Sequence, residues 1–438
     1  MRVAHVITRL IVGGAQENTI ATVDGLRRKP GCKVSLISGP SPGAEGSLEP
    51  SVRAAGIELQ IVPSLVRPVH PLRDFAALHQ LTDLFRAQRP NVVHTHSGKA
   101  GVLGRLAAAR ACVPIIIHTI HGPSFGNFQG ALANWIFTAA ERRAARVTSH
   151  FISVAGAMTE QYLAAGIGKR SQFTTIRSGF DVEPFLQAQN DPRLRAQLGL
   201  KAEDIVVGKI ARLFKLKGHD DLLDIAPELI RAEPRLKLLF LGDGPWRSRL
   251  EQRAHAAGIG GHICFAGLVP PTEVHRYIGV MDFLVHLSYR EGLPRALPQA
   301  LAAARPVIAY DCDGAREVCV HGKTGFLIPP GNRAELTRAI RQLTADAALR
   351  TRLGGAGQSL VCDQFPTQRM VDEIFALYER LLSGSSTSRI GGVQSSKSQV
   401  PSTGETSSTK LRQDVARFCN LKFGASRELG TSSPELSP

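Results

Sequence analysis

Two cations and one carboxylate are of residue types that together suit an activated sugar. Arg212 and Lys217 lie in the segment ARLFKLKG, and Glu291 lies in SYREGLPR. Arginine offers a planar fork of donors and lysine a movable charge, so the pair suits a diphosphate whose negative charge grows as a sugar departs. A carboxylate beside them would accept hydrogen bonds from sugar hydroxyls. The combination predicts a site for a sugar that carries a diphosphate.

Both clusters follow a buried apolar run and precede a helical pattern, which places them at the edge of a sheet. Arg212 and Lys217 come directly after IVVGKIA, and ligands of open α/β sheets bind beyond the carboxyl ends of the strands. Pro294 follows Glu291 closely and suits the first position of a helix, where its missing N–H costs nothing. The amides around residues 293–296, apart from Pro294, would then be unpaired donors that face the same ligand.

Glycines mark two further strand ends at which a ligand could approach the backbone. Gly13 and Gly14 close the first strand, and Gly242 and Gly244 follow the run LKLLFL. Without Cβ atoms, such turns can bring amides close to an anion at a helix N-terminus. A plain tight turn is the alternative interpretation at both places. Arg247 stands where a dinucleotide fingerprint needs its last glycine, so the pattern does not favour a nicotinamide site.

Four histidines near strand ends raise the question of a metal. His94 and His96 alternate along one expected strand, and His118 and His121 belong to the next. A zinc site needs a tetrahedral set with supporting partners, and no cysteine or carboxylate is paired with these histidines in the sequence. We predict no metal site. His121, at a strand end before Gly122, is better interpreted as a cleft residue that hydrogen-bonds the reacting sugar or its phosphate.

The pair Asp311 and Asp313 spells D-x-D, a pattern that elsewhere holds a divalent metal for sugar transfer. Here it follows VIAY and begins a loop, where aspartates commonly form turns and cap helices. We interpret it as a turn.

The helical segment 131–146 joins Trp135 and Phe137 to a cluster of arginines. Such a helix could lie on an anionic membrane. We favour the other interpretation, in which the apolar side packs in the core and the basic face is solvated.

These clusters need strands and helices to position them, and two successive parts of the chain show expected strands that alternate with expected helices. This alternation predicts two doubly wound parallel sheets. The first has expected strands at 2–8, 33–38, 58–62, 91–95, 115–120 and 150–154, and helices at 15–27, 74–87, 101–109, 131–144 and 158–165. The second has expected strands at 205–210, 236–241, 262–265, 283–287, 306–310 and 325–328, and helices at 220–232, 248–257, 272–278, 295–304 and 333–344.

Turn residues at 178–185 predict the boundary between two Rossmann-like domains, 1–180 and 181–365. A late helix at 366–382 follows the second sheet and is expected to pack back on the first domain. From residue 383 to 438 the composition shifts to Ser, Thr, Gly and Lys, which predicts a disordered tail, with a short apolar segment at 416–423.

Composition narrows the class of protein. A chain of 438 residues with 43% hydrophobic residues can fill two hydrophobic cores. Its net charge of +16 suggests a negatively charged binding partner. Trp and Tyr are scarce and nucleic-acid motifs are absent from the sequence, which disfavours nucleic acid. An anionic membrane surface and anionic substrates remain as alternatives.

The sequence favours the cytoplasm. No uninterrupted apolar run reaches about 18 residues, and the first residues lack the pattern of an export signal. The seven cysteines are scattered without C-x-x-C spacing, which favours buried free thiols over disulfides or zinc. We expect a cytoplasmic protein, with peripheral contact at the inner face of the cytoplasmic membrane left open.

The chain resembles the retaining family 4 (group 1) glycosyltransferases of the GT-B fold. The resemblance covers residues 1–382 and rests on these segments in this order: RLIVGGAQE, HTIHG, ARLFKLKG, LGDGP, FAGLV, SYREGLPRALPQA and HGKTGFLIP. It implies that a nucleotide-diphosphate sugar binds mainly to the second, donor domain and faces a glycan or lipid-linked acceptor held by the first.

The resemblance also implies roles for single residues. Arg212 and Lys217 would clamp the diphosphate, Glu291 would hold sugar hydroxyls, and His121 would lie near the anomeric carbon. The implied donor-binding residues are Gly13, Gly14, Gly242, Gly244, Phe265, Ala266, Gly267, Leu268, Gly292, Leu293, Pro294, Arg295 and Gln299. No metal cofactor is expected, and the leaving phosphate would deprotonate the acceptor, so no protein nucleophile is assigned.

The resemblance points to cell-envelope or exopolysaccharide synthesis, and one departure bears on it. The family usually has a second glutamate where this chain has Gln299, and the lost charge costs about 1–2 kcal/mol of donor binding. Two alternatives stay open: a non-catalytic sugar-nucleotide-binding or assembly protein, and a GT-B-fold epimerase that acts on the sugar nucleotide itself.

Overall fold

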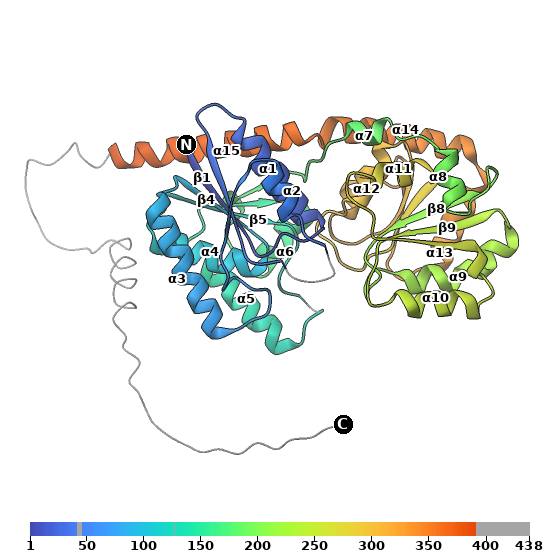
Figure 1. Cartoon of the computed structure of the whole chain (residues 1–438), viewed down its shortest axis with the longest axis horizontal. Helices are drawn as coiled ribbons and strands as arrows, with labels where there is room; N and C mark the ends of the chain where they lie inside the picture. The colour runs from blue at the N-terminus through green and yellow to red at the C-terminus, as the bar shows by residue number, and fades with distance from the viewer. Residues whose placement is uncertain (42–45, 127, 391–438) are drawn as a thin grey trace, which may run out of the picture. The chain divides into compact units, whose positions relative to one another are not determined.

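Buried apolar runs form two parallel sheets in the computed structural model, which describes residues 1–41, 46–126 and 128–390 (Figure 1). The first sheet has the order β3-β2-β1-β4-β5-β6-β7, and its strands are β1 (Arg2–Ile7), β2 (Lys33–Ser38), β3 (Glu58–Ile61), β4 (Val92–His96), β5 (Ile115–Ile120), β6 (His150–Ser153) and β7 (Phe173–Thr175). The second has the order β10-β9-β8-β11-β12-β13, and its strands are β8 (Ile205–Ile210), β9 (Leu236–Leu241), β10 (Ile263–Gly267), β11 (Phe283–His286), β12 (Val307–Tyr310) and β13 (Gly325–Ile328).

Helices follow most strands, as parallel connections require. Those between the strands of the first sheet, or directly after it, are α1 (Gly14–Arg27), α2 (Glu49–Ala54), α3 (Pro71–Gln88), α4 (Gly98–Arg110), α5 (Ala131–Ala145), α6 (Gly156–Ala164), α7 (Glu183–Leu186) and α8 (Pro192–Gln197). Those associated with the second sheet are α9 (His219–Ala232), α10 (Arg247–Ala256), α11 (Val274–Gly279), α12 (Ala296–Ala302), α13 (Arg333–Ala345) and α14 (Ala347–Gln364). Short 3-10 turns are η1 (Arg170–Gln172), η2 (Gly260–His262) and η3 (Asp313–Glu317).

Each sheet reverses its strand order at one point. In the first, β1 pairs with both β2 and β4, and in the second, β8 pairs with both β9 and β11. The chain leaves neighbouring strands in opposite directions there, which opens a crevice at the carboxyl ends where ligands of such sheets bind. The segments after β1, β4, β8 and β11 are therefore the positions in which to look for a site.

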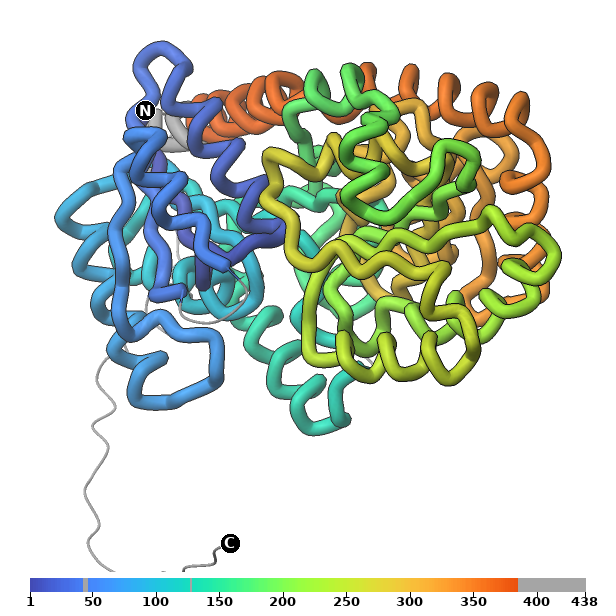
Figure 2. Tube along the Cα trace, turned by 45° about the vertical axis from the view of Figure 1, so that its right-hand side comes forward, coloured from blue at the N-terminus to red at the C-terminus, as the bar shows by residue number. Residues whose placement is uncertain are grey.

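The last described helix, α15 (Thr367–Ile390), completes the core of the first sheet (Figure 2). Val371, Ile374 and Leu377 are buried among apolar residues of β1, β4 and β5. The Asn18 side chain donates a hydrogen bond to the sulfur of Met370 at 3.0 Å. Residues far apart in the sequence thus share one core, and Met1–Ser386 form one compact unit that holds both sheets.

The sequence missed several elements. Strand β7 is short, and α14 is rich in glycine, which disfavours a helix. Gly354 and Gly357 are buried there because α12 lies close: a Cβ on Gly354 would stand 2.0 Å from the carbonyl oxygen of Ala304. Helix α15 continues to Ile390, past the predicted start of the tail at residue 383. The predictions for residues 391–438 lie outside the described residues, and the domain boundaries at 180 and 365 stay predictions.

The prediction of buried free thiols is confirmed for Cys32 and Cys319 and is wrong for Cys112 and Cys362, which are exposed. Among the described residues, no helix combines the length and the apolar character that a bilayer crossing requires.

Candidate functional site

A lysine and a glutamate from two loops of the second sheet form an ion pair. Lys217 follows β8 and Glu291 follows β11, so both lie at the point where the strand order reverses. Lys217 Nζ contacts Glu291 Oε1, and the hydroxyl of Ser288 donates to the same oxygen at 3.0 Å. The side chains are 17% and 25% exposed, so the pair is sheltered and still reachable by a ligand.

The surroundings keep Glu291 ionised. Burial alone would raise the pKa of its carboxyl, but His286, whose Nε2 lies 3.5 Å from Oε1, and the charge of Lys217 hold that pKa well below its usual range. Burial in turn lowers the pKa of His286 in spite of the carboxylate. The site therefore presents a carboxylate, an ammonium group and an imidazole at neutral pH.

Backbone and side-chain contacts hold the two loops together. The amide of Tyr289 donates to the carbonyl of Leu216 at 2.9 Å, and its hydroxyl donates to Asp221 Oδ2 at 2.6 Å. Asp221 also accepts hydrogen bonds from Arg333 at 3.2 and 3.3 Å. Lys217 and Glu291 thus stand on loops that are fixed to each other next to the site.

Arg212 lies at the same sheet edge and is exposed. Its guanidinium carbon lies 5.6 Å from the centre of the Phe214 ring. Glycines shape this loop, because a Cβ on Gly242 would stand 2.2 Å from the carbonyl oxygen of Ala211 and one on Gly244 2.5 Å from that of Leu213. Both glycines have positive φ. They therefore position the Arg212 loop, whether or not they also contact a ligand.

A buried lysine lies beneath this edge in β8. Lys209 is 1% exposed, and burial together with the charge of Lys217 lowers its pKa to about 7, in spite of Asp221 and Glu291. Burial and these two lysines also keep His219, which begins α9, neutral. The second sheet therefore carries, near the ion pair, a buried lysine that is about half charged at neutral pH.

Asp313 links the two halves of the molecule. It accepts hydrogen bonds from the amide of Glu291 at 2.7 Å and from the side chain of Gln161 in α6 at 2.6 Å. Asp311 instead pairs with Arg316 through two hydrogen bonds of 2.9 and 2.7 Å. Asp313 begins η3, and Asp311 lies in a bend two positions before it, so the interpretation of the pair as a turn is confirmed, although Asp313 also positions Glu291.

The loop after Glu291 touches the loop after β5. A Cβ on Gly292 would stand 1.8 Å from the carbonyl oxygen of His121, so only glycine permits this approach. His121 is part-buried, and burial lowers its pKa to about 4, which keeps the ring neutral. The structure thus brings His121 and Glu291 to one place from different sheets.

Arg295 lies opposite the first glycine turn. Its Cβ and Cδ lie 3.9 Å from the position of a Cβ on Gly14, and its Nη2 lies 3.3 Å from a carboxylate oxygen of Glu17 in α1. Among the described residues, its buried Nε and Nη1 have no hydrogen-bond partner. Unpaired guanidinium donors are costly to bury and are the groups that an anionic ligand satisfies. Gly13 precedes α1 in extended backbone.

An open hollow of about 770 Å³ lies at the first sheet, and Arg290, which precedes Glu291 in the chain, is among the residues that line it. Thr8 and Ser97, which follow β1 and β4, line it together with Phe128 and Ile136. Arg290 reaches into it from the second sheet, donates to the carbonyl of Pro123 and stacks 3.3 Å from the centre of the Phe128 ring. This first-sheet hollow has room for a second substrate.

Helix α5 packs only in part as predicted. Leu132, Trp135 and Ile136 are 72%, 68% and 48% exposed, whereas Glu141 is fully buried. Glu141 is buried because it forms an ion pair at 2.5 Å with Arg105, which is buried as well. The prediction is therefore wrong for Leu132, Trp135 and Ile136. It is confirmed for Phe137, which packs partly buried against the core, and for the basic face, whose arginines Arg142, Arg143 and Arg146 are exposed.

The other predicted donor residues lie in β10 or directly after it, and in α12 or the segment that leads into it. The ring of Phe265 packs edge-on against Phe240 at 5.3 Å, and Arg247 donates to the Phe265 carbonyl at 3.4 Å. Gln299 is buried in α12, which begins at Ala296, two positions after Pro294. The remaining ones are Ala266 and Gly267 in β10, exposed Leu268, and Leu293, which packs against the cores of both sheets.

Sequence reasoning missed Ser288, His286 and Asp313 as supports of Glu291. Ser288 and His286 lie just before Glu291 in the segment HLSYRE, so the sequence could have predicted that they lie close to it. Nothing in the sequence pairs Asp313 with Gln161, because that contact joins residues 152 positions apart.

Two family models match the chain in sequence. One, described as Glycosyltransferase Family 4, matches residues 12–184, and the other, described as Glycosyl transferases group 1, matches residues 190–360. The provisionally named glycosyltransferase EpsD of Bacillus subtilis is 30% identical over 326 residues, which cover 72% of this chain and 83% of EpsD.

A longer alignment joins the chain to a UDP-Gal:alpha-D-GlcNAc-diphosphoundecaprenol alpha-1,3-galactosyltransferase of Escherichia coli, 26% identical over 86% of this chain and 96% of that enzyme. Among solved structures, HepE of Anabaena, in complex with UDP and glucose, superimposes with a TM-score of 0.74 and 21% identity over 86% of this chain and 99% of HepE. That likeness and the two sheets confirm the predicted GT-B fold.

Proposed function

Since the chain belongs to the group 1 glycosyl transferases, we propose that it moves a sugar from a nucleotide-diphosphate donor to a glycan or lipid-linked acceptor in cell-envelope or exopolysaccharide synthesis. The observation that carries this proposal is the ion pair between Lys217 and Glu291, in contact with the loop of His121. A diphosphate binds a cation and sugar hydroxyls donate to a carboxylate, so neighbouring groups of both kinds suit the two parts of one donor.

The donor is proposed to bind along the edge of the second sheet. Arg212 and Lys217 neutralise the diphosphate, with Lys209 adding positive potential from behind. The unpaired donors of Arg295 support an anion beside Gly14. On binding, Lys217 exchanges part of its contact with Glu291 for phosphate oxygens. The segment Phe265–Leu268 lies along the base.

Glu291 is proposed to hold the sugar rather than to attack it. Lys217, Ser288 and His286 converge on its Oε1, which fixes the carboxylate so that Oε2 accepts the sugar hydroxyls. We propose transfer with retention, in which the departing phosphate takes the proton of the acceptor hydroxyl. The cations already present support a reaction without a metal.

The donor assignment is tested with a panel of UDP-, GDP- and ADP-sugars, in which nucleotide release is measured with and without a chelator. We expect one nucleotide to be released, with no effect of the chelator, and an α-linked product from an α-linked donor. The Lys217→Met variant should raise the KM for the donor at least about ten-fold, whereas Lys215→Met, a nearby exposed lysine, should not.

Silence across the panel, with no thermal shift by any sugar nucleotide, would contradict the proposal. Binding without turnover would favour a non-catalytic binding protein, and a changed sugar nucleotide without acceptor would favour an epimerase.

The acceptor is proposed to be lipid-linked and to enter from an anionic membrane surface. The first-sheet hollow is flanked by exposed apolar side chains of α5 and of the segment that begins α3. These are Val69, Leu72, Phe75, Leu132, Trp135 and Ile136. With the net charge of +16, such a surface suits peripheral contact at the cytoplasmic membrane face.

The membrane proposal is tested by flotation with vesicles of phosphatidylglycerol and of phosphatidylcholine. We expect binding to the anionic vesicles that weakens with salt, and a loss of that binding in Leu132→Ser/Trp135→Ser. The same variant should keep turnover with a water-soluble acceptor. Equal binding of the variant and the wild type would contradict this surface.

A further inference from the structure

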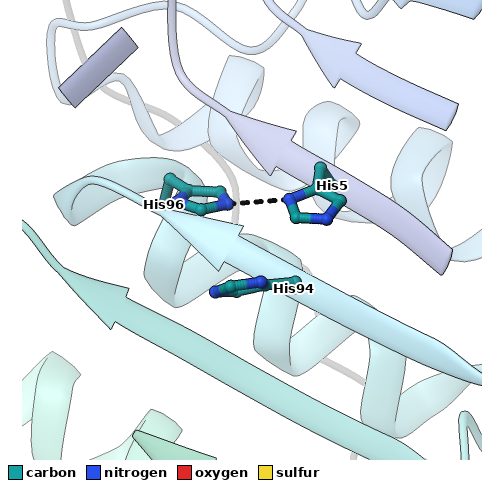
Figure 3. A group of neighbouring side chains, drawn as sticks. All are labelled: His5, His94 and His96. Atoms are coloured by element: carbon teal, nitrogen blue, oxygen red, sulfur yellow. Dashed lines mark hydrogen bonds between the residues drawn. The ribbon is translucent and has the colours of Figure 1, made fainter. Parts of the chain in front are cut away.

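A chain of hydrogen bonds descends from His121 into the core of the first sheet. His121 Nε2 lies 3.0 Å from Nδ1 of His96 in β4, and His96 Nε2 lies 2.9 Å from Nδ1 of His5 in β1. Figure 3 shows the second of these contacts and His94 beside it, on the same strand as His96. Each ring thus uses one nitrogen toward the site and the other toward the interior.

The chain continues through the last helix. His5 Nε2 lies 3.5 Å from the hydroxyl of Tyr378 in α15, and that hydroxyl lies 2.5 Å from His94 Nδ1. His94 Nε2 then lies 2.6 Å from the hydroxyl of Thr119 in β5. Every ring nitrogen of the three buried histidines has one of these partners.

Burial keeps every member uncharged. It lowers the pKa of His5 to about 3, lowers the pKa of His94 and His96 well below the usual value, and raises that of Tyr378 well above it. A neutral imidazole has one donor and one acceptor nitrogen, so the proton position on one ring dictates that on the next. The whole chain then has two arrangements, which differ in the direction of every hydrogen bond.

In one arrangement the Thr119 hydroxyl donates to His94, each following group donates onward, and His121 accepts at Nε2. His121 then carries its proton on Nδ1, the nitrogen that the chain leaves available. In the other arrangement all bonds are reversed, and Nδ1 has no proton. Phosphate and sugar hydroxyl oxygens accept hydrogen bonds, so the first arrangement is the productive one.

We propose that the chain Thr119–His94–Tyr378–His5–His96 is a positioning relay that fixes the tautomer and orientation of His121, so that its Nδ1–H faces the reacting sugar phosphate. This inference rests on the proposed function of the site. It gives α15 a part in the chemistry, because Tyr378 is the link between two histidines of different strands.

The same rings are also the candidate for a metal. Ligand nitrogens of His5, His94 and His96 lie within 4.8 Å of one another. A zinc ion would need these nitrogens as ligands, whereas they already bond to one another, to Tyr378 and to Thr119. The hydrogen bonds favour the relay over a metal site. A bound metal ion is the alternative that the experiment must exclude.

The test breaks one link without changing its bulk. Tyr378→Phe and Thr119→Val each remove one hydroxyl of the relay. The control is Thr95→Val, which removes a buried hydroxyl that bonds to His118 and the Ile117 carbonyl instead. The tautomer of His121 is read by ¹⁵N NMR of the histidine-labelled protein, and steady-state kinetics separate kcat from the KM for the donor.

We expect His121 to change from one tautomer in the wild type to a mixture in both relay variants. Their kcat should fall by about three- to ten-fold, the range that one neutral hydrogen bond supports, with the donor KM unchanged. Thr95→Val should retain the tautomer and the kcat. Thr119→Val keeps the test valid if Tyr378→Phe fails to fold.

An unchanged His121 tautomer in the folded relay variants would overturn the relay. So would one equivalent of zinc in the purified protein, measured by mass spectrometry. Absence of turnover in the wild type would count against the proposed function, while the NMR result would still decide the relay.

Discussion

The carboxyl edges of the two sheets share one strand order and hold different kinds of polar side chain. At the first sheet, His5, His96 and His121 are kept neutral by burial. At the second, Lys217 and Glu291 form an ion pair in front of buried Lys209. We name the two edges the neutral edge and the charged edge after these sheltered groups, although α3 and α4 beside the first edge also carry the ion pair of Asp74 with Lys99.

The difference follows from what burial does to each group. A buried imidazole loses its proton at little cost near neutral pH, whereas a carboxylate stays ionised in a sheltered site only if cations lie beside it. The charged edge suits a diphosphate, and the neutral edge suits hydroxyl groups that donate and accept hydrogen bonds. The two sheets share a topology, so the kind of ligand that each edge suits depends on the polarity of its side chains.

Glu291→Gln should produce the largest effect, because it removes the negative charge of the charged edge and preserves its shape. Lys217 and His286 then lack their carboxylate, and we expect turnover to fall by about 100- to 1000-fold in a nucleotide-release assay. Glu228→Gln is the control, since it removes an exposed ion-pair partner of Arg341. Near wild-type activity in Glu291→Gln would break the contrast between the edges.

Gly292→Ala acts where the two edges meet. The new methyl group would collide with the His121 carbonyl and displace both loops, and we expect kcat to fall by about 10- to 100-fold. Gly355→Ala, on an open side of α14, should instead raise the free energy of unfolding by about 0.5–1 kcal/mol. Equal kinetics in the two variants would contradict the close approach.

Gln299→Glu sharpens the comparison by adding charge to the charged edge. If Gln299 lies against the ribose of the donor, the carboxylate should tighten donor binding about ten-fold in titration calorimetry. Gln342→Glu, at an exposed position of α13, should leave the affinity unchanged. Weaker binding in Gln299→Glu would place this side chain away from the ribose.

Lys209 should affect the pH dependence of stability. Its pKa is about 7 in the folded chain, against 10.5 for an unperturbed lysine. Between these values the unfolded chain binds more protons, so the free energy of unfolding should rise with pH. Urea denaturation at pH 6 to 10 should show this rise in the wild type and in the exposed-lysine control Lys215→Met, but not in Lys209→Met. A parallel profile in Lys209→Met would contradict the lowered pKa of Lys209.

The sequence predicted the architecture well because parallel strands buried on both faces appear as apolar runs. It placed Arg212, Lys217 and Glu291 after such runs, and the structure puts all three at the edge of the second sheet. Their roles in donor binding stay predictions.

The rest depends on contacts between residues far apart in the chain. The burial of Glu141 in α5 follows from its ion pair with Arg105, and no local sequence pattern predicts that pair. The histidine relay likewise needs β1, β4 and α15 together. Hydrophobic periodicity reports which face of an element is buried, but it does not report which polar groups meet inside.

The course of α15 has a consequence for biosynthesis. Residues beyond Pro366 form a wall of the core that Val3, Leu26 and Ile115 share. As the chain emerges from the ribosome, these side chains of the first sheet stay uncovered until α15 has been translated. The core of the first sheet is therefore synthesised first and completed last. A fragment that stops at residue 180 would expose the apolar residues that α15 covers.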